Sequence, residues 1–383
     1  MVCSFGMAPL VPLRNIMKSF VEEGIKLDKP FTVDPRPMDF ENVTVNEQEK
    51  QIFENVLYNC QEEYADLLEK IGLKNRNAFS CACYLDEVGN IPSYGMNLAW
   101  AESSAVVYAN SVLGARTNRN SGVIEMFSGV LGKTPKFGFL TDEGRKASWI
   151  IELKTSKLPR PQILGSAIGM KVVEKVPYII SLDQYLGTEL TLDVKDYLKD
   201  MGAATASNGA VGLYHVENLT PEAKKYGKDL ILENAQIYVI DDAELERVVN
   251  SYPIMWKDLN AVPEKAFIGC PHCSFNQVIN WTKTFEEALK IEEKEKVAIE
   301  TVITCAPYVI DKFKRTEYYE MLLKMGIHIS GICPLMYMSN PMCSTKAIIT
   351  NSNKLRTYST ARYVDDDTLV DAVIKGGLNN ERI

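Results

Sequence analysis

The sequence has no surplus of positive charge and no long apolar run, and each absence excludes a class of protein. Lys and Arg together number 42 against 50 Asp and Glu, which gives a formal net charge of −8. A chain with this balance has few cations left to neutralise phosphates, so we expect no nucleic-acid partner. No apolar stretch approaches the roughly 20 residues that a helix needs to cross a bilayer, so we expect no membrane partner.

Signals for export are also missing. The opening residues, MVCSFGMAPLVPLRN, lack the basic segment that precedes the apolar part of a signal peptide. The nine cysteines form an odd number at irregular spacing, unlike the disulfide framework of a small secreted domain. We therefore expect a cytoplasmic protein with reduced thiols, some of them metal ligands and others small buried hydrophobes.

Composition and patterning together predict an α/β fold. The 383 residues, 46% hydrophobic and 24% charged, suffice for two or three domains with real cores. Short β-type runs alternate with helical stretches, which predicts mainly parallel sheets flanked by helices. A glycine-rich stretch, 201–212, predicts an internal loop or a junction between subdomains. The expected strands are 78–85, 136–140, 177–181, 235–240, 265–269, 302–306, 327–332 and 347–350, and the expected helices include 13–23, 102–113, 243–251, 285–294, 309–324 and 368–375.

The motif Cys270-Pro-His-Cys273 stands between an apolar run and a helical stretch. A Cys-X-X-Cys between a strand and a helix is typical of thioredoxin-like redox proteins, in which the helix N-terminus stabilises a thiolate. Such domains are small, however, whereas this motif lies deep within a long α/β chain. A thiolate held in this way is also a good iron or zinc ligand, so both interpretations stay open.

Three cysteines stand within or just beyond the ends of expected strands, namely Cys81, Cys270 and Cys333. The carboxyl ends of parallel strands meet at one edge of a sheet, where sites form. Three thiolates that converge there could hold an iron–sulfur cluster with one iron open to substrate. The alternatives are ordinary buried cysteines, or a zinc site from Cys81-X-Cys83 with Cys270-X-X-Cys273, although Cys-X-Cys is tight for zinc.

The segment AWAESSAVVYANSVLGARTNR, residues 99–119, predicts a helix with polar groups at both of its ends. Glu102 lies at the start of this helix, where the helix dipole favours a carboxylate that can relay a proton. Gly114 ends the helix, and Arg116, Asn118 and Arg119 follow it. This arrangement suits one wall of an active site, but it also suits a capped core helix followed by a polar loop.

The same segment, together with FSCACYL at 79–85, resembles the catalytic core of aconitase X, a divergent branch of the aconitase superfamily. The resemblance covers nearly the whole chain and includes PFTVDPRPMD (30–39), IGCPHCS (268–274), SGICP (330–334) and TNSNKLRTY (350–358). It implies an aconitase-like multi-layer fold that corresponds to the large subunit of the two-chain members and lacks the small swivel domain.

The resemblance also implies an activity. Members of this family are lyases that dehydrate small hydroxy acids with an iron–sulfur cluster, here expected to be of the [4Fe-4S] or [3Fe-4S] type. The implied ligands are Cys81, Cys270 and Cys333, and relatives tend to have proline in place of Cys83. The implied substrate is mevalonate 5-phosphate, in an archaeal mevalonate pathway, with cis-3-hydroxy-L-proline as the alternative. The alternatives of another class are the thioredoxin-like redox protein and a non-catalytic homologue that keeps the fold but binds neither iron nor a hydroxy acid.

Substrate contacts implied by the resemblance are Asp34, Pro35, Glu102, Ser103 and Lys354. Glu102 and Ser103 would be catalytic, with Glu102 relaying a proton or orienting water and Ser103 hydrogen-bonding the substrate. Lys354 would bind a carboxylate or phosphate as a point charge. The proton would be abstracted by a serine of a separate small subunit, so that the working enzyme is a heterodimer.

Two features depart from the family pattern. Relatives have a longer N-terminal segment with a substrate loop that contains glycine and serine, of which Ser4 and Gly6 would be the remainder. Asp34 stands where relatives often have asparagine, and its carboxylate adds negative charge beside an anionic substrate. Both departures bear on which hydroxy acid the site accepts.

Overall fold

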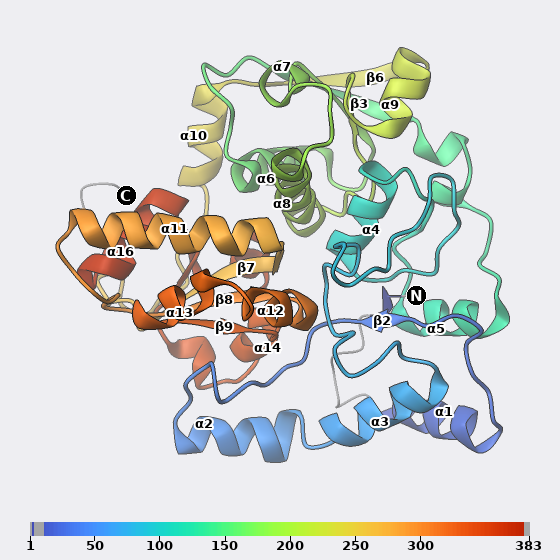
Figure 1. Cartoon of the computed structure of the whole chain (residues 1–383). Coiled ribbons are helices and arrows are strands. Elements are labelled where there is room, and N and C mark those ends of the chain that lie inside the picture. The colour runs from blue at the N-terminus through green and yellow to red at the C-terminus, as the bar shows by residue number, and fades with distance from the viewer. Residues whose placement is uncertain (1, 4–10, 379–383) are drawn as a thin grey trace. The chain divides into compact units, whose positions relative to one another are not determined.

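Each of the two structural units is built around one β-sheet of parallel strands (Figure 1). The computed structural model describes residues 2–3 and 11–378, so that Ser4 and Gly6 lie outside the described residues. The middle unit comprises residues 90–252 with Val2 and Cys3. The split unit comprises the segments on either side of it, up to residue 89 and from residue 253.

The middle unit contains a four-stranded sheet in the order β5-β4-β3-β6, with all of its pairs parallel. Helices α6 and α8 pack against each other, and α8 also contacts α4. The elements of this unit are β1 (Val2–Cys3), α4 (Ser103–Ser111), α5 (Gly122–Leu131), η2 (Gly138–Leu140), η3 (Glu143–Arg145), β3 (Ala147–Leu153), α6 (Pro161–Val172), β4 (Pro177–Ile180), α7 (Asp183–Leu186), α8 (Leu192–Asn208), β5 (His215–Val216), α9 (Pro221–Tyr226), η4 (Gly227–Leu230), β6 (Ile231–Ile240) and α10 (Asp242–Asn250).

The split unit contains a five-stranded parallel sheet in the order β11-β10-β7-β8-β9. Its elements are α1 (Val11–Glu22), β2 (Thr32–Val33), α2 (Glu47–Ile52), the π-helix η1 (Phe53–Leu57), α3 (Gln61–Ile71), β7 (Lys265–Cys273), α11 (Phe275–Ile291), β8 (Glu300–Cys305), α12 (Pro307–Phe313), α13 (Glu317–Lys324), β9 (Ile327–Ser330), α14 (Pro334–Met338), η5 (Cys343–Thr345), β10 (Ile348–Thr350), α15 (Asn353–Tyr358), β11 (Arg362–Tyr363) and α16 (Asp366–Lys375).

Helices cover the five-stranded sheet, and most residues of its strands are buried. Helix α11 contacts α12, α13 and α16. A separate hydrophobic cluster joins strand residues such as Phe267 and Val302 to Phe53 and Tyr58 of the N-terminal segment. The predicted α/β fold with mainly parallel sheets flanked by helices is therefore confirmed. Among the described residues, no helix is both long enough and apolar enough to span a bilayer.

Two of the predicted strands are wrong, and in both places side chains satisfy the backbone instead of a ladder. Residues 78–85 form only a single bridge at Phe79, after which the Ala82 N–H donates to Ser80 Oγ at 3.0 Å and the chain turns. Within residues 136–140 only the 3₁₀ turn η2 (Gly138–Leu140) forms, and the Phe139 N–H donates to Asn118 Oδ1 at 2.8 Å.

The loop predicted over 201–212 is also wrong over most of its length, because α8 continues to Asn208. Gly202 lies within α8, where an added Cβ would come within 3.0 Å of the Val107 side chain of α4, and α6 makes a similar close approach. A Cβ on Gly165 of α6 would collide with the Met201 carbonyl of α8 and come within 2.7 Å of the Ala204 Cβ. The structure divides the chain elsewhere, at 89/90 and 252/253.

A buried ion pair fixes the C-terminal end of helix α4. The Arg145 guanidinium donates to both carboxylate oxygens of Glu222 at 2.8–2.9 Å, and both side chains are almost completely buried. Arg145 also donates to the Asn110 side-chain and main-chain oxygens of α4 at 3.1 and 3.0 Å. Burial lowers the pKa of His215 to about 4, so its ring is neutral at pH 7 and donates to the Arg145 carbonyl at 2.8 Å.

We predict that Glu222→Gln destabilises the protein by about 3 kcal/mol or more, because it leaves the buried Arg145 charge uncompensated. Lys224→Gln in the same helix is the matched control, since its pair with Glu189 is exposed and is worth about 1 kcal/mol or less. Urea unfolding of both variants measures the difference. Equal stability of the two variants would show that the buried pair does not anchor α4.

Candidate active site

An irregularity in strand β7 carries Cys270 out of the sheet. Ile268 pairs with Ile303 of β8, and the next pair is Cys273 with Cys305, so β7 advances five residues while β8 advances two. The three extra residues form a bulge at the carboxyl end of the strand. Thr304 closes the bulge, because its hydroxyl donates to the Gly269 carbonyl at 2.6 Å.

Only glycine fits at the start of this bulge. Gly269 has φ of +99°, a conformation that other residues rarely adopt. A Cβ there would collide with the Thr304 carbonyl and come within 2.9 Å of Cys273 Sγ. The backbone at Gly269 therefore sets where Cys270 stands.

Cys333 occupies the loop that follows strand β9, two strands away from β7 in the sheet. It is the N-cap residue of α14, and its N–H donates to the Arg36 carbonyl at 2.9 Å. The residue as a whole is half-buried. Burial, followed by the neighbouring Cys270 thiol, raises the pKa of the Cys333 thiol to about 12, so the thiol is neutral unless a metal displaces its proton.

Cys81 reaches the same place from the N-terminal part of the chain. The Ser80 N–H donates to the Val33 carbonyl at 2.8 Å, which fixes the residue before Cys81 beside β2. The Cys81 sulfur in turn accepts a hydrogen bond at 3.3 Å from the N–H of His272, within the β7 bulge. Cys81 is therefore adjacent to the segment that carries Cys270.

Residues 33–36 connect two of the cysteine-bearing segments. At one end the Val33 carbonyl receives the Ser80 N–H, and at the other the Arg36 carbonyl receives the Cys333 N–H. Asp34 and Pro35 lie between these two attachment points. The Asp34 carboxylate acts on the Cys333 thiol, where its charge favours the neutral form and adds to the rise in pKa. Both predicted substrate contacts on this segment thus border the cysteine site.

Lys354 comes from the loop after β10, at the start of helix α15, and only 7% of its surface is exposed. Its charge acts on Cys333 in the opposite sense from Asp34 and favours the thiolate. Ser352, the N-cap of α15, joins this loop to the β7 bulge, because its hydroxyl donates to the Cys270 carbonyl. The structure thus brings together the predicted residues Cys81, Cys270, Cys333, Asp34, Pro35 and Lys354 within the split unit.

Glu102 and Ser103 belong to the middle unit. Glu102 is the N-cap of α4 as predicted, and its carboxylate accepts hydrogen bonds at 2.6 Å from the Ala105 N–H and from the Ser104 hydroxyl. The Ser103 hydroxyl lies 3.4 Å from the other carboxylate oxygen. Glu102 is 5% exposed, so the helix N-terminus holds a buried carboxylate in one orientation.

The remaining cysteines of the two motifs are interior residues. Cys83 and Cys273 are 0% and 2% exposed, and Cys273 faces Cys305 across the β7–β8 ladder. Both members of Cys270-X-X-Cys273 are reduced, and Cys273 belongs to the strand rather than to a helix N-terminus. This placement differs from a thioredoxin-like dithiol and from a zinc site of paired cysteines.

The donor set fits a polynuclear iron–sulfur group better than a single ion. Within residues 2–3 and 11–378, no three His, Cys, Asp or Glu side chains converge closely enough to hold one metal ion. In a cluster each thiolate binds a different iron, so the three sulfurs stand apart from one another. Three thiols from three separate segments suit such a group, because thiolates are the ligands that iron–sulfur clusters prefer.

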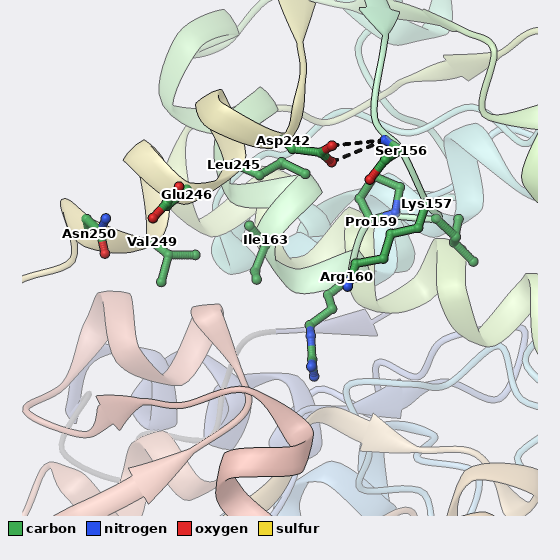
Figure 2. A pocket seen from close by; sticks show the side chains of 11 residues that line it. Ser156, Lys157, Pro159, Arg160, Ile163, Asp242, Leu245, Glu246, Val249 and Asn250 are labelled. Carbon is green, nitrogen blue, oxygen red and sulfur yellow. Dashed lines mark hydrogen bonds between the residues drawn. The ribbon is translucent and has the colours of Figure 1, made fainter. Parts of the chain in front are cut away.

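A separate pocket of about 520 Å³ lies in the middle unit, between the segment after β3 and helix α10 (Figure 2). At one side of the pocket, both oxygens of the Asp242 carboxylate accept from the single Ser156 N–H, at 3.1 and 3.2 Å. The lining is mainly apolar, from residues such as Ile163, Leu245 and Val249. The predicted site residues are not among those that line it.

Sequence reasoning missed the residues that hold the cysteines in place. His272 and Ser80 are buried and hydrogen-bonded to each other at 3.1 Å, and neither was expected to contribute. Ser80 directly precedes the predicted ligand Cys81, and His272 follows the predicted ligand Cys270 by two residues. That adjacency was the available signal, because groups that support metal ligands commonly lie beside them.

Comparison with known proteins identifies the family of the chain. Models of the aconitase X first, second and third domains match residues 13–143, 147–250 and 263–368. The chain belongs to the aconitase X family.

Individual relatives support the same assignment. The phosphomevalonate dehydratase large subunit of Thermococcus kodakarensis is 31% identical over 282 residues, which cover 73% of this chain and 63% of that protein. The chain thus spans less than two thirds of that relative. The cis-3-hydroxy-L-proline dehydratase of Hypocrea jecorina is 29% identical over 73% of this chain and 46% of its own. The crystal structure of Thermococcus kodakaraensis aconitase X in its holo-form superposes with a TM-score of 0.76 at 28% identity, covering 94% of this chain and 85% of that one.

We predict that Gly269→Ala disrupts the cysteine site more than the fold. A side chain at this φ, in contact with the Thr304 carbonyl, must shift the bulge and hence Cys270. Metal content after anaerobic reconstitution should fall several-fold. Gly132→Ala is the control, because its φ is also positive but nothing lies within 4 Å of its added Cβ. Equal metal content in the two variants would contradict the role of Gly269.

Proposed function

We propose that this chain is the large subunit of a hydro-lyase that dehydrates a small hydroxy acid with an iron–sulfur cluster held by Cys81, Cys270 and Cys333. The observation that carries the proposal is the meeting of three thiol-bearing segments at the carboxyl edge of the five-stranded sheet, with Lys354 beside Cys333. The dehydratase names of the relatives support the reaction class.

The substrate we propose is mevalonate 5-phosphate, which would lose water to give an anhydromevalonate phosphate within a mevalonate pathway. The support is the similarity to phosphomevalonate dehydratase large subunits, such as that of Thermococcus kodakarensis at 31% identity. A hydroxyproline substrate has weaker support, from relatives such as the Hypocrea jecorina protein at 29%. The name "large subunit" also supports a small-subunit partner, and reduced thiols are consistent with a cytoplasmic enzyme.

The charged residues beside Cys333 would bind and orient the substrate. Lys354 would bind an anionic group of the substrate, and its burial strengthens that attraction because little water screens it. Asp34, whose carboxylate also acts on Cys333, would orient the substrate by repelling a second anionic group. These opposite charges at one thiol would favour one orientation of an elongated anion.

Dehydration also requires a proton to move to the departing hydroxyl. Glu102 would relay that proton, since its carboxylate is held at the helix N-terminus by two short hydrogen bonds. The Ser103 hydroxyl would hydrogen-bond the substrate. The bound cluster would supply a Lewis acid that stabilises the leaving hydroxyl and the carboxylate. Abstraction of the carbon-bound proton we assign to a serine of the small subunit.

The test is anaerobic co-expression with a small-subunit partner, followed by assays of mevalonate 5-phosphate and cis-3-hydroxy-L-proline. We predict turnover of the phosphate ester. Turnover of hydroxyproline alone would replace the substrate but keep the reaction class, and a loaded heterodimer that dehydrates neither compound would refute the function.

Cys333→Ser in the same preparation should abolish both the visible chromophore and activity, since the cluster would lose one of its three thiolates. Cys305→Ser is the matched control, because Cys305 is a fully buried thiol of the same sheet that faces Cys273 instead of the proposed site. Retention of colour and activity in Cys333→Ser would remove Cys333 from the ligand set.

A further inference from the structure

The side chain of His272 connects the segment that carries Cys81 to the segment that carries Cys333. Its Nδ1 is 3.1 Å from Ser80 Oγ, and its Nε2 is 3.0 Å from the Ile332 carbonyl oxygen. Ser80 directly precedes Cys81, and Ile332 directly precedes Cys333. His272 itself follows Cys270 by two residues in the β7 bulge. One imidazole thus joins all three segments.

The chemistry of these partners fixes the direction of both hydrogen bonds. A carbonyl oxygen only accepts, so Nε2 must carry the hydrogen that is donated to Ile332. In the neutral ring Nδ1 is then an acceptor, and the Ser80 hydroxyl donates to it. Ser80 Oγ also accepts the Ala82 N–H at 3.0 Å, so the hydroxyl donates on one side and accepts on the other. The ring therefore has one defined orientation.

Burial makes these bonds costly to lose. His272 and Ile332 are each 1% exposed, and Ser80 is completely buried. Water cannot replace the imidazole at such positions without a local opening of the structure, so removing the ring leaves a buried carbonyl and a buried hydroxyl without these partners. The three segments would then shift to satisfy them.

The backbone of His272 also acts on a proposed ligand atom. Its N–H donates to Cys81 Sγ at 3.3 Å, and hydrogen bonds to the sulfurs are among the factors that set the potential of an iron–sulfur group. An imidazole anchored at both nitrogens holds this peptide unit in place. The side chain and the backbone of one residue thus act on the same site.

We propose that His272 is the positioning residue of the cysteine site, which holds the segments of Cys81, Cys270 and Cys333 at the spacing that the cluster requires. This inference rests on the proposed function, because it presupposes a cluster on these three thiols. His272 acts through the ligands and their neighbours, and touches neither the substrate nor the reacting atoms.

Three substitutions separate its contacts. His272→Ala removes both side-chain hydrogen bonds. His272→Gln can place an amide N–H near the position of Nε2 and keep the bond to Ile332, whereas His272→Asn can place an amide oxygen near Nδ1 and keep the bond to Ser80. His328→Gln, in strand β9 of the same sheet, controls for the loss of a histidine outside the cysteine-bearing segments.

The experiment uses the full chain, reconstituted anaerobically with iron and sulfide, and measures the rate at which a chelator bleaches the visible absorption, together with the EPR spectrum of the reduced state. We expect His272→Ala to lose its cluster about 10–100-fold faster than the wild type and to show an altered EPR spectrum. His272→Gln and His272→Asn should lose their clusters at rates between those of the wild type and His272→Ala. His328→Gln should lose its cluster at the wild-type rate.

Thermal melts of the metal-free proteins show whether a variant has simply failed to fold, and in that case the Gln and Asn variants decide the matter. If folded His272→Ala loses its cluster as slowly as the wild type, with the same spectrum, the positioning role is refuted while the proposed function stands. If the wild type itself takes up no cluster, both are refuted.

Discussion

The interrupted ladder between β7 and β8 is the constraint on which the cysteine site depends. If the two strands paired without interruption, Cys270 and His272 would be ordinary strand residues, with both side chains on the same face of the sheet. Three extra residues between Ile268 and Cys273 lift them out of the sheet instead. Gly269 permits the departure and Thr304 closes it, so both residues serve the geometry of a neighbouring thiol.

Once Cys270 stands outside the sheet, the other elements reach it by short connections. Residues 33–36 tie the Cys81 segment to the Cys333 loop through main-chain hydrogen bonds, and Ser352 ties the Lys354 loop to the Cys270 carbonyl. The site is therefore assembled from four segments that are distant in sequence. In the middle unit, too, residues distant in sequence hold a site element, because the buried Arg145–Glu222 pair anchors the helix that follows Glu102.

Much of the fold could be predicted because apolar runs mark parallel strands. The strands at 177–180, 265–273 and 300–305 lie where such runs predict them. Strand β3, at the centre of its sheet, was missed because polar Ser148 and Glu152 interrupt its apolar pattern. The wrong strand at 78–85 has the opposite cause. Its residues are apolar enough for a strand, but the Ser80 hydroxyl captures a backbone N–H and turns the chain.

Some residues of the candidate site could be predicted from the sequence, and others could not. Cys270, Cys333 and Lys354 were predictable because each follows or ends a strand, and such residues meet at one edge of a parallel sheet. Cys81 was expected there from a strand that does not exist, and it reaches the site through a bridge to β2 instead. The role of His272 could not be predicted, because it depends on partners at Ser80 and Ile332 that only the folded chain brings together.

Native mass spectrometry of the anaerobically reconstituted chain tests the central claim most directly. The wild type should carry the mass of one iron–sulfur cluster per chain, and a variant in which Cys81, Cys270 and Cys333 are all serine should carry none while it keeps the wild-type secondary structure. A wild-type mass equal to that of the bare polypeptide, or a cluster retained by the triple variant, would contradict the account.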